Sequence, residues 1–317
     1  MQFKKPKFWD KKKPDLISFL LLPFTLIIKI NNFFQSFASP KKNNFIKSIC
    51  VGNIYLGGTG KTPTTIKLFK ILKKLKTRVA VGKKFYLSQK DEITILKNHT
   101  NLIISSTRKN IIKKAKELRQ EVVVFDDGLQ DNTIYHDIKI VCFDYQTWIG
   151  NGQLIPAGPL REELDSLKKY DCVFLKDIDS NKVNIFSKKI KKVNRNIKIF
   201  FTYLEISNLK QIKKFNKIII FSGIGNPSSF KKILQKNNFN IIEEIIYPDH
   251  YEYKKDDITE IKKKAKKIGA NIITTEKDFI KLSDKEKKNI NFLKVNLKIK
   301  NEKNFINFLK FKIHGKY

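Results

Sequence analysis

A glycine-rich loop that joins an apolar strand to an amphipathic helix is the feature that most constrains this chain. The loop reads Gly52-Asn53-Ile54-Tyr55-Leu56-Gly57-Gly58-Thr59-Gly60-Lys61-Thr62 and follows the apolar run 45–51. Glycines let backbone N–H groups curl around phosphate oxygens, and a helix N-terminus favours negative charge. Tyr55 stands where the general phosphate-loop pattern has its first glycine, but Gly57 and Gly58 lie inside the loop. The pattern predicts a nucleotide phosphate site rather than an ordinary glycine-rich turn.

The residues of this loop have distinct expected roles. Lys61 can bridge the β- and γ-phosphates of ATP, and Thr62 can offer its hydroxyl to Mg²⁺. The expected phosphate-binding set is Asn53, Gly57, Gly58, Thr59, Gly60, Lys61 and Thr62.

An acidic pair follows a second apolar run. Asp126 and Asp127 come directly after the expected strand 121–125 and before Gly128. Carboxylates at the C-terminal end of a strand next to a phosphate loop can hold Mg²⁺ or its waters. The alternative is a plain Asp-Asp-Gly turn. Taken with the loop, the pair predicts nucleotide chemistry with Thr62, Asp126 and Asp127 at the metal.

The order of apolar runs predicts an α/β protein. Apolar β-branched runs alternate with segments of helical period, a pattern typical of a parallel sheet covered by helices. The expected strands are 45–51, 78–81, 121–125, 138–143, 172–175, 197–203, 217–221, 241–247, 271–274 and 292–295. Polar stretches at 180–196 and 204–216 place a boundary near residue 205. We expect a basic N-terminal segment with a helix at 1–40, a P-loop-type parallel-sheet domain at 41–205 and a smaller second α/β domain at 206–317.

The N-terminal segment predicts contact with a membrane surface. Residues 16–28 carry no charge and are flanked by Lys11, Lys12, Lys13 and Lys29. A membrane-spanning helix needs about 20 apolar residues, and Pro23 interrupts this run. We favour a helix lying in the bilayer interface. The alternatives are a buried helix or a signal peptide ending near Ala38, although an ATP site directly after it argues against export.

The formal net charge of +35 gives weak information about partners. Basic residues attract nucleic acid or anionic lipid, but here they are spread along a chain that is rich in Lys, Asn and Ile throughout. We therefore expect no specific nucleic acid, and we keep a preference for anionic lipid. The three cysteines, Cys50, Cys142 and Cys172, lie in apolar runs and indicate reduced core residues of a cytosolic protein.

Further motifs make the chain resemble a known family. They are Val51-Gly52-Asn53 through Lys61-Thr62-Pro63, Asp126-Asp127-Gly128-Leu129-Gln130, Gly150-Asn151-Gly152, Pro156-Ala157-Gly158-Pro159-Leu160-Arg161-Glu162, Ser222-Gly223-Ile224-Gly225, Pro248-Asp249-His250 and Thr274-Thr275-Glu276-Lys277-Asp278. In this order they resemble tetraacyldisaccharide 4'-kinase of lipid A biosynthesis. The resemblance implies two α/β/α domains with a short β linker, and a membrane-associating N-terminal helix. It also implies transfer of the ATP γ-phosphate to the 4'-hydroxyl of an acylated disaccharide 1-phosphate lipid, giving lipid IVA. The enzyme would act peripherally at the cytoplasmic face of the bacterial inner membrane.

The resemblance also implies roles for individual residues. Lys61 and Thr62 would take the phosphate and Mg²⁺ roles, and Asp126 and Asp127 match the acidic metal pair. Arg161 and Glu162 match the Arg-Glu that ends a loop near the active site. Arg161 would bind a substrate phosphate or stabilise charge on the transferred group, and both possibilities stay open.

The expected catalytic base is Asp91. Of the family's Ser-Arg-Gly-Tyr segment only Tyr86 is kept here, and Asp91-Glu92 follows after a short connection. The resemblance makes Asp91 the base that orients the sugar hydroxyl, with His250, preceded by Asp249, as its partner. Because these residues lie on either side of the expected domain boundary, we expect the two domains to close during catalysis. The position after Gln130, usually His in the family, is Asp131.

Two rival functions lack support in the sequence. A GTPase-like switch needs a guanine-reading Asn/Thr-Lys-x-Asp, and Thr275-Glu276-Lys277-Asp278 has these residue types in another order. A basic nucleic-acid-dependent P-loop ATPase is the main alternative to the kinase, and it predicts hydrolysis that DNA or RNA stimulates and salt abolishes.

Overall fold

The computed structural model describes residues 5–37, 40, 42, 45–177 and 179–315, which divide into two compact units. The large unit contains residues 5–85, 99–203 and 297–315, and the small unit contains residues 86–98 and 204–296. The expected boundary near residue 205 lies beside residue 204, where the main part of the small unit begins. Two segments differ from the expected ranges, because residues 86–98 belong to the small unit and residues 297–315 to the large one.

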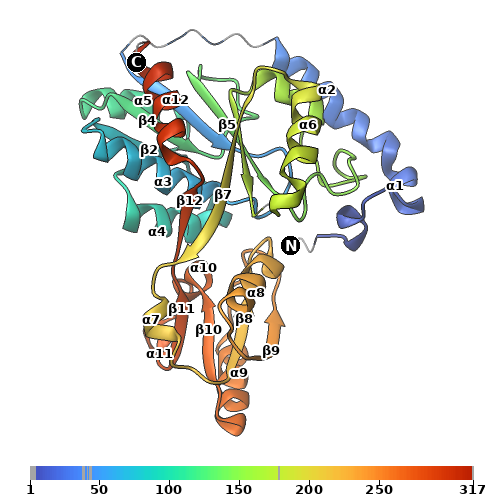
Figure 1. The fold of residues 1–317 in the computed structure, drawn as a ribbon, viewed down its shortest axis with the longest axis vertical. Helices are drawn as coiled ribbons and strands as arrows, with labels where there is room; N and C mark the ends of the chain where they lie inside the picture. The colour runs from blue at the N-terminus through green and yellow to red at the C-terminus, as the bar shows by residue number, and fades with distance from the viewer. Residues whose placement is uncertain (1–4, 38–39, 41, 43–44, 178, 316–317) are drawn as a thin grey trace. The chain divides into compact units, whose positions relative to one another are not determined.

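An eight-stranded sheet forms the centre of the large unit, with the order β12-β7-β6-β5-β1-β4-β2-β3 (Figure 1). The strands are β1 Lys47–Gly52, β2 Val79–Lys84, β3 Leu102–Ser105, β4 Val122–Asp126, β5 Ile138–Asp144, β6 Cys172–Lys176, β7 Lys198–Ile206 and β12 Val295–Ile299. All neighbouring pairs from β7 to β3 are parallel, which confirms the expected parallel sheet. Backbone hydrogen bonds join Ser207 N to Lys294 O and Lys300 N to Phe201 O. The numbers run in opposite directions, so β12 is an antiparallel edge strand.

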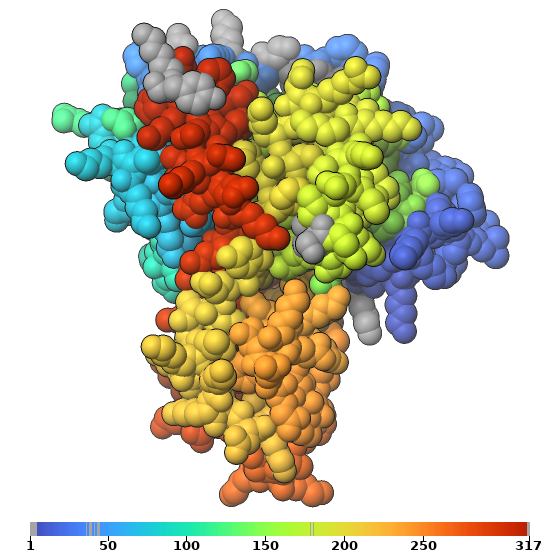
Figure 2. All heavy atoms as spheres, viewed as in Figure 1, coloured from blue at the N-terminus to red at the C-terminus, as the bar shows by residue number. Residues whose placement is uncertain are grey.

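The helices of the large unit connect and cover these strands. Besides the helices of the N-terminal segment, they are α3 Lys61–Lys74, α5 Arg108–Glu117, α6 Val183–Val193 and α12 Glu302–His314, with the short 3₁₀ turns η4 Leu164–Lys169 and η5 Ser180–Lys182. α3 packs on β1, β2 and β4, and α5 packs on β2 and β3. The C-terminal helix α12, red in Figure 2, lies at the surface of this unit. Lys67 of α3 pairs with Glu302 at 2.7 Å, and the ring of Phe305 lies 4.9 Å from that of Phe174.

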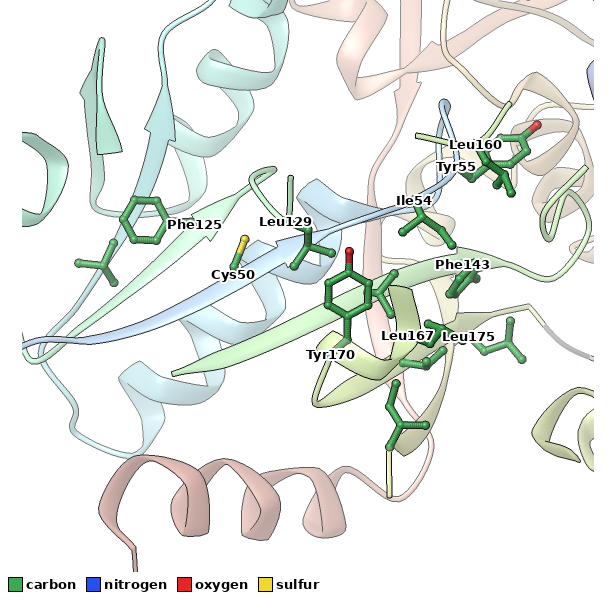
Figure 3. Close-up of a cluster of buried hydrophobic side chains, with 14 of the residues drawn as sticks. Cys50, Ile54, Tyr55, Phe125, Leu129, Phe143, Leu160, Leu167, Tyr170 and Leu175 are labelled. Carbon is green, nitrogen blue, oxygen red and sulfur yellow. The ribbon is translucent and has the colours of Figure 1, made fainter. Parts of the chain in front are cut away.

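Apolar residues of the central strands form the core of the large unit. Figure 3 shows Cys50, Phe125, Leu129, Phe143 and Tyr170 among the packed side chains. Burying one large apolar side chain contributes roughly 1.5–3 kcal/mol, so this cluster fixes β1 and β4 beside each other. Cys50, Cys142 and Cys172 are all buried and free, which agrees with the reading of these thiols as core residues.

The small unit has its own parallel sheet, with the order β11-β10-β8-β9. Its elements are η3 Leu87–Gln89, α4 Lys90–His99, α7 Leu209–Ile212, β8 Ile218–Ser222, α8 Pro227–Lys236, β9 Ile241–Ile246, α9 Lys255–Ile268, β10 Asn271–Thr275, α10 Glu276–Phe279, α11 Asp284–Lys287 and β11 Ile290–Leu293. β8 is buried along its whole length and has core clusters on both sides. The second α/β unit expected from the sequence is therefore present.

The N-terminal segment packs on the large unit through one aromatic residue and several backbone groups. It contains η1 Lys7–Asp10, α1 Leu16–Leu21, η2 Leu22–Phe24 and α2 Thr25–Ser36. Trp9 is 1% exposed and donates from Nε1 to Pro156 O at 3.0 Å. Asn151 N donates to Trp9 O at 3.0 Å. Gly150 has φ +57°, and a Cβ there would lie 2.2 Å from Trp9 O, so only glycine allows this close approach.

Two strands differ from the expectation. The strand expected at 292–295 is divided at Lys294 into β11 and β12, which belong to different sheets. β3 was not expected, because its four residues follow a polar stretch and only Ile103 is fully buried. A short edge strand gives too few apolar positions for a period-2 pattern to be seen.

One buried histidine makes the large unit sensitive to acid. Burial, and then the charges of Arg108 and Lys139, lower the pKa of His136 to about 3, and Ser48 Oγ lies 2.7 Å from its Nδ1. An unfolded histidine has a pKa near 6.5, so the unfolded chain binds the extra proton between these values. The stability that the neutral ring provides is present above about pH 6.5 and is lost as the pH falls toward 3.

We therefore expect His136 to contribute a fall of about 1.4 kcal/mol in unfolding free energy per pH unit below about 6.5. His136→Asn keeps a group that can hydrogen-bond to Ser48 but cannot take this proton. Denaturant unfolding at pH 5.0, 6.0 and 7.5 should show a shallower slope for His136→Asn than for wild type. The exposed His314→Asn is the matched control. Equal slopes for wild type and His136→Asn would contradict the assignment.

Candidate active site

The phosphate loop is held in shape by a buried asparagine. Asn53 follows β1, and its Nδ2 donates to Tyr55 O at 2.5 Å, to Gly57 O at 3.2 Å and to Thr59 Oγ1 at 3.0 Å. Gly60 has φ +89°, a left-handed conformation that starts α3 and that other residues rarely adopt. Gly58 lies within this braced turn. The side chain of Asn53 thus shapes the loop, and its expected part in phosphate binding is indirect.

Lys61 opens α3 with its ammonium group next to the acidic pair. Its Nζ lies 3.3 Å from Asn53 Oδ1 and 3.6 Å from Asp127 Oδ2, and its side chain is 12% exposed. Both contacts hold the ammonium group of Lys61 beside the phosphate loop, in a position from which it could contact a phosphate group.

Asp126 ends β4 and is surrounded by donors. Its Oδ1 accepts from Thr65 Oγ1 at 2.9 Å, and its Oδ2 accepts from Thr62 Oγ1 at 3.3 Å and from Lys83 Nζ at 2.7 Å. Asp126 and Lys83 are both almost completely buried. A buried carboxylate with this many donors is fixed in place, so it can hold the Thr62 hydroxyl toward a cation. The hydroxyl and the carboxylates supply the oxygen ligands that Mg²⁺ prefers.

Lys83 is a site residue that sequence reasoning missed. It lies on β2, which is paired with β4 in the sheet, so its side chain reaches Asp126 from the neighbouring strand. A lysine directly after the apolar run Val79-Ala80-Val81-Gly82, within reach of the same strand, was the available signal. Its partner could be identified only once the order of the strands was known.

Asp127 connects the phosphate loop with Arg161, because its carboxylate lies near both Lys61 and Arg161. It has φ +60°, and its carboxylate lies 3.2 Å from Arg161 Nη1 as well as near Lys61. Gln130 supports the same corner, since its Oε1 lies 3.4 Å from Arg161 Nη1 and its Nε2 donates to Asn53 O at 3.0 Å.

The segment that ends in Arg161 and Glu162 pairs with the phosphate loop through its backbone. Leu56 N donates to Pro159 O at 2.8 Å, and Arg161 N donates to Ile54 O at 2.7 Å. Glu162 is buried and accepts a hydrogen bond from the hydroxyl of Tyr170. The side chain of Arg161 thus contacts Asp127 in the site, whereas the buried side chain of Glu162 fixes this segment by its hydrogen bond with Tyr170.

Asp131, which follows Gln130, has a defined partner. Asp131 forms an ion pair with buried Arg108, which also donates to the backbone carbonyl of Asp127. Burial favours a higher pKa for Asp131, but hydrogen bonds from Thr133 and the charge of Arg108 outweigh burial and lower it. The contacts of Arg108 therefore hold Asp131 and the backbone of Asp127 together at this corner of the site.

The small unit contains the second group of predicted residues. Asp91 lies in the first turn of α4, and His250 follows β9 with φ +59°. His250 Nδ1 lies 3.2 Å from Asp91 Oδ1 and 3.1 Å from Asp91 Oδ2. The structure therefore brings both residues together within one unit. This differs from the expectation that they belong to different domains, because α4 packs with the small unit.

The surroundings of Asp91 favour its charged form. Burial acts to raise its pKa, but the hydrogen bond from His250 and the charge of Lys277 outweigh burial, and the pKa lies below its ordinary value. Lys281, 3.6 Å from Asp91 Oδ2, acts in the same direction. Asp91 is therefore an ionised carboxylate that can accept a hydrogen bond from a hydroxyl at neutral pH.

Two further predicted residues lie nearby in the chain. Asp249 accepts a hydrogen bond from His250 N at 3.0 Å through its Oδ1, and the same oxygen accepts from Lys277 Nζ at 3.2 Å. Tyr86 precedes η3 and is 43% exposed. Of the predicted set, the structure thus places Tyr86, Asp91, Asp249 and His250 in the small unit, and all the others in the large unit.

Comparison with known proteins gives one consistent result. The family model described as tetraacyldisaccharide-1-P 4'-kinase matches residues 16–314. A protein named tetraacyldisaccharide 4'-kinase from Pelagibacter ubique (strain HTCC1062) is 44% identical over 310 residues, which is 98% of each chain. A protein of the same name from Rickettsia akari (strain Hartford) is 34% identical over 314 residues, or 93% of each chain.

A solved structure shares the fold. The crystal structure of the "apo" form of LpxK from Aquifex aeolicus in complex with ATP has a TM-score of 0.68 at 23% sequence identity. The match covers 94% of this chain and 100% of that chain.

Proposed function

Because the chain belongs to the tetraacyldisaccharide 4'-kinase family, we propose that it transfers the γ-phosphate of ATP to the 4'-hydroxyl of tetraacyldisaccharide 1-phosphate in lipid A biosynthesis, forming lipid IVA. The observation that carries the proposal is the arrangement of the phosphate loop. Lys61 lies between Asn53 and Asp127, and Thr62 lies on Asp126. A nucleic-acid-dependent ATPase, the main rival, would not account for this family membership.

In the large unit, the proposed role of these residues is to bind and polarise the triphosphate. The loop amides and Lys61 would lie against the phosphate oxygens and stabilise the charge that spreads over the transferred group. Mg²⁺ neutralises phosphate charge when bound. Thr62, Asp126 and Asp127 are the residues that would hold it or its waters. Arg161, already paired with Asp127, would move its guanidinium to a phosphate when the nucleotide enters.

In the small unit, the proposed role of Asp91 is to orient the acceptor and take its proton. A sugar hydroxyl is a poor nucleophile at neutral pH, so a carboxylate within hydrogen-bond reach lowers the barrier. The hydroxyl oxygen forms its bond to the γ-phosphorus, the bond from the γ-phosphorus to the β–γ bridging oxygen breaks, and the hydroxyl proton passes to Asp91. The lowered pKa of Asp91 keeps this carboxylate ionised, so that it can accept a hydrogen bond from the acceptor hydroxyl.

A direct assay tests this function. Purified protein is incubated with ATP, Mg²⁺ and disaccharide lipid 1-phosphate in detergent, and the lipid products are separated by mass. We expect a bisphosphorylated lipid with one more phosphate than the substrate, and ADP in equal amount. Rapid ATP hydrolysis that is stimulated by RNA or DNA, without a new lipid, would contradict the kinase proposal.

We further propose that the N-terminal segment places the enzyme on the cytoplasmic face of the inner membrane, in contact with anionic lipid. Among the described residues, one helical segment, Leu16–Gln35, is long and apolar enough to cross a membrane by length and composition. Its large side chains are nevertheless turned outward. The exposed ones, from 48% to 75%, are Leu16, Ile17, Phe19, Leu20, Phe24, Leu26, Ile27, Ile30, Phe33 and Phe34.

Contacts on its other side favour a helix that lies along the membrane surface. Lys29 forms an ion pair with Glu163 at 2.9 Å, and Asn32 Nδ2 donates to Arg161 O at 3.0 Å. Ser18 Oγ accepts from Asn151 Nδ2 at 2.9 Å. A spanning orientation would place Lys29 in hydrocarbon and break these contacts, whereas an interfacial one keeps them.

Substitutions on the exposed apolar face test this placement better than truncation, because Trp9 and Asn32 also support the segment 156–161 through their hydrogen bonds to its backbone. Leu20→Glu with Phe34→Glu should weaken partitioning into liposomes containing anionic lipid by at least about tenfold, since each removes roughly 1.5–3 kcal/mol of apolar burial. Sedimentation with liposomes measures it. Leu118→Glu, at an exposed apolar residue of the same unit, is the control. Unchanged partitioning of the double variant would argue against the interfacial helix.

A further inference from the structure

Two lysines that the proposed mechanism does not use face the Asp91–His250 pair. Lys277 Nζ lies 3.3 Å from His250 Nε2 and 3.7 Å from Asp91 Oδ2. Lys281 Nζ lies 3.6 Å from the same Asp91 oxygen. Lys277 comes from α10 and Lys281 follows it closely, so a single short segment supplies both charges. Both side chains are mostly buried.

The contact with Lys277 determines which histidine nitrogen carries hydrogen. An ammonium group has three donors and no acceptor, so at hydrogen-bond distance the facing nitrogen must accept. His250 Nε2 therefore presents its lone pair to Lys277. In the neutral ring the hydrogen is then on Nδ1, which faces both oxygens of Asp91.

We propose that Lys277 is a positioning residue that holds His250 as the neutral Nδ1–H tautomer, donating to Asp91. The kinetic part of this inference rests on the proposed kinase function, whereas the tautomer itself does not. With Nε2 occupied by Lys277 and Nδ1 bearing hydrogen, the ring has no free lone pair for the acceptor hydroxyl. The proton of that hydroxyl must then pass to Asp91, and His250 serves to fix the carboxylate.

A buried carboxylate holds Lys277 in this position. Asp278 is fully buried, and its Oδ2 accepts from Gly223 N at 3.0 Å and from Thr275 Oγ1 at 2.7 Å. Thr275 in turn caps α10 by accepting from Asp278 N. His250 N also contacts Gly223 O at 3.3 Å. The end of β8, the start of α10 and the His250 loop are thus joined, so Lys277 and His250 are fixed relative to each other.

Charged groups from several elements surround the pair. The groups that face it are Glu92 from α4, Asp249 from the loop after β9, Lys277 and Asp278 from α10, and Lys281, which lies over Tyr253. Burial acts to lower the pKa of Lys277, but Asp249, Glu92 and Asp91 outweigh it and raise this pKa, so the ammonium persists at neutral pH. Loss of one ammonium removes a positive charge beside Asp91, which raises the pKa of that carboxyl.

The tautomer can be measured directly on the full chain labelled with ¹⁵N-histidine. Long-range ¹H–¹⁵N correlation at pH 7.5 distinguishes the protonated from the unprotonated ring nitrogen, and the His250 signals are those missing from His250→Asn. We expect hydrogen on Nδ1 in the wild type and a change to Nε2–H or imidazolium in Lys277→Met. The exposed Lys266→Met is the control that should keep the wild-type pattern. Hydrogen on Nε2 in the wild type overturns the proposal, even if Lys277→Met fails to fold.

The kinase assay provides the second readout. Lys277→Met should lower kcat by about 10–100-fold with KM for ATP within about twofold, and the acid limb of its pH–kcat profile should move to higher pH. Lys277→Arg, which keeps a cationic donor, should restore the position of that limb. An active wild type with an unchanged limb in Lys277→Met overturns the proposal. A wild type that makes no bisphosphorylated lipid contradicts the proposed function instead, and the tautomer measurement still decides this inference.

Discussion

Lys61→Ala is expected to lower kcat of the lipid kinase reaction by at least about 100-fold, or about 2.7 kcal/mol of transition-state stabilisation. Lys61 is the cation that opens α3 after the phosphate loop, and Asn53 and Asp127 hold its ammonium group in place. Charge grows on the phosphoryl oxygens during transfer, and the truncated side chain leaves that charge unmet. The measurement is steady-state formation of bisphosphorylated lipid at saturating ATP.

A control on the same helix separates this effect from general loss of positive charge. Lys74 lies in the last turn of α3 and is exposed, so Lys74→Ala should leave kcat within about twofold of wild type. Thermal unfolding of both variants shows whether the fold is kept. If Lys61→Ala turned over within a few-fold of wild type, the loop would not be the ATP site.

The parts of the site that follow from local sequence were predictable. The phosphate loop and the pair Asp126-Asp127 each combine a buried parallel strand with the turn directly after it. The ends of β1 and β4 are neighbours in the sheet, so both motifs meet at one edge. This information is contained in stretches of about ten residues, which pattern reasoning reads well.

Contacts between distant segments were not predictable in the same way. Lys83 reaches Asp126 because β2 is paired with β4, and Lys277 reaches His250 because α10 and the His250 loop lie at the same end of a parallel sheet. The chain contains 65 Lys and Arg residues, and the sequence does not show which partners these two lysines contact. Their burial and the carboxylates beside them are visible only in the structure.

The unit to which α4 belongs shows the same limit. Asp91 follows β2, a strand of the large unit, by only a few residues. The sequence therefore predicts that Asp91 belongs to the same domain as β2. The structure instead groups residues 86–98 with the small unit. A connection as short as 85–89 gives no signal of a change between units, because its composition resembles that of any other loop.

The joint action of Asp91 and His250 is the second large effect that we expect. Asp91→Ala and His250→Ala should each lower kcat by about 100-fold or more, with little change in ATP affinity, because the phosphate loop lies on other elements. His250 Nδ1 contacts both oxygens of Asp91, so we expect His250 to act by fixing that carboxylate. Once Asp91 is absent, His250 has no carboxylate to orient. The double variant should therefore be scarcely slower than the slower single variant.

The double-mutant cycle measures this coupling in the kinase assay. Asp256→Ala, an exposed acidic residue in the first turn of α9, is the matched control and should combine multiplicatively with His250→Ala. Because Asp91→Ala leaves the ammonium groups of Lys277 and Lys281 without one of their carboxylates, unfolding midpoints must accompany the rates. If the penalties of Asp91→Ala and His250→Ala multiply in stably folded proteins, the two residues act independently and the pair is not a functional unit. A near-normal rate for Asp91→Ala would remove it as the base, and another group would have to accept the proton of the 4'-hydroxyl.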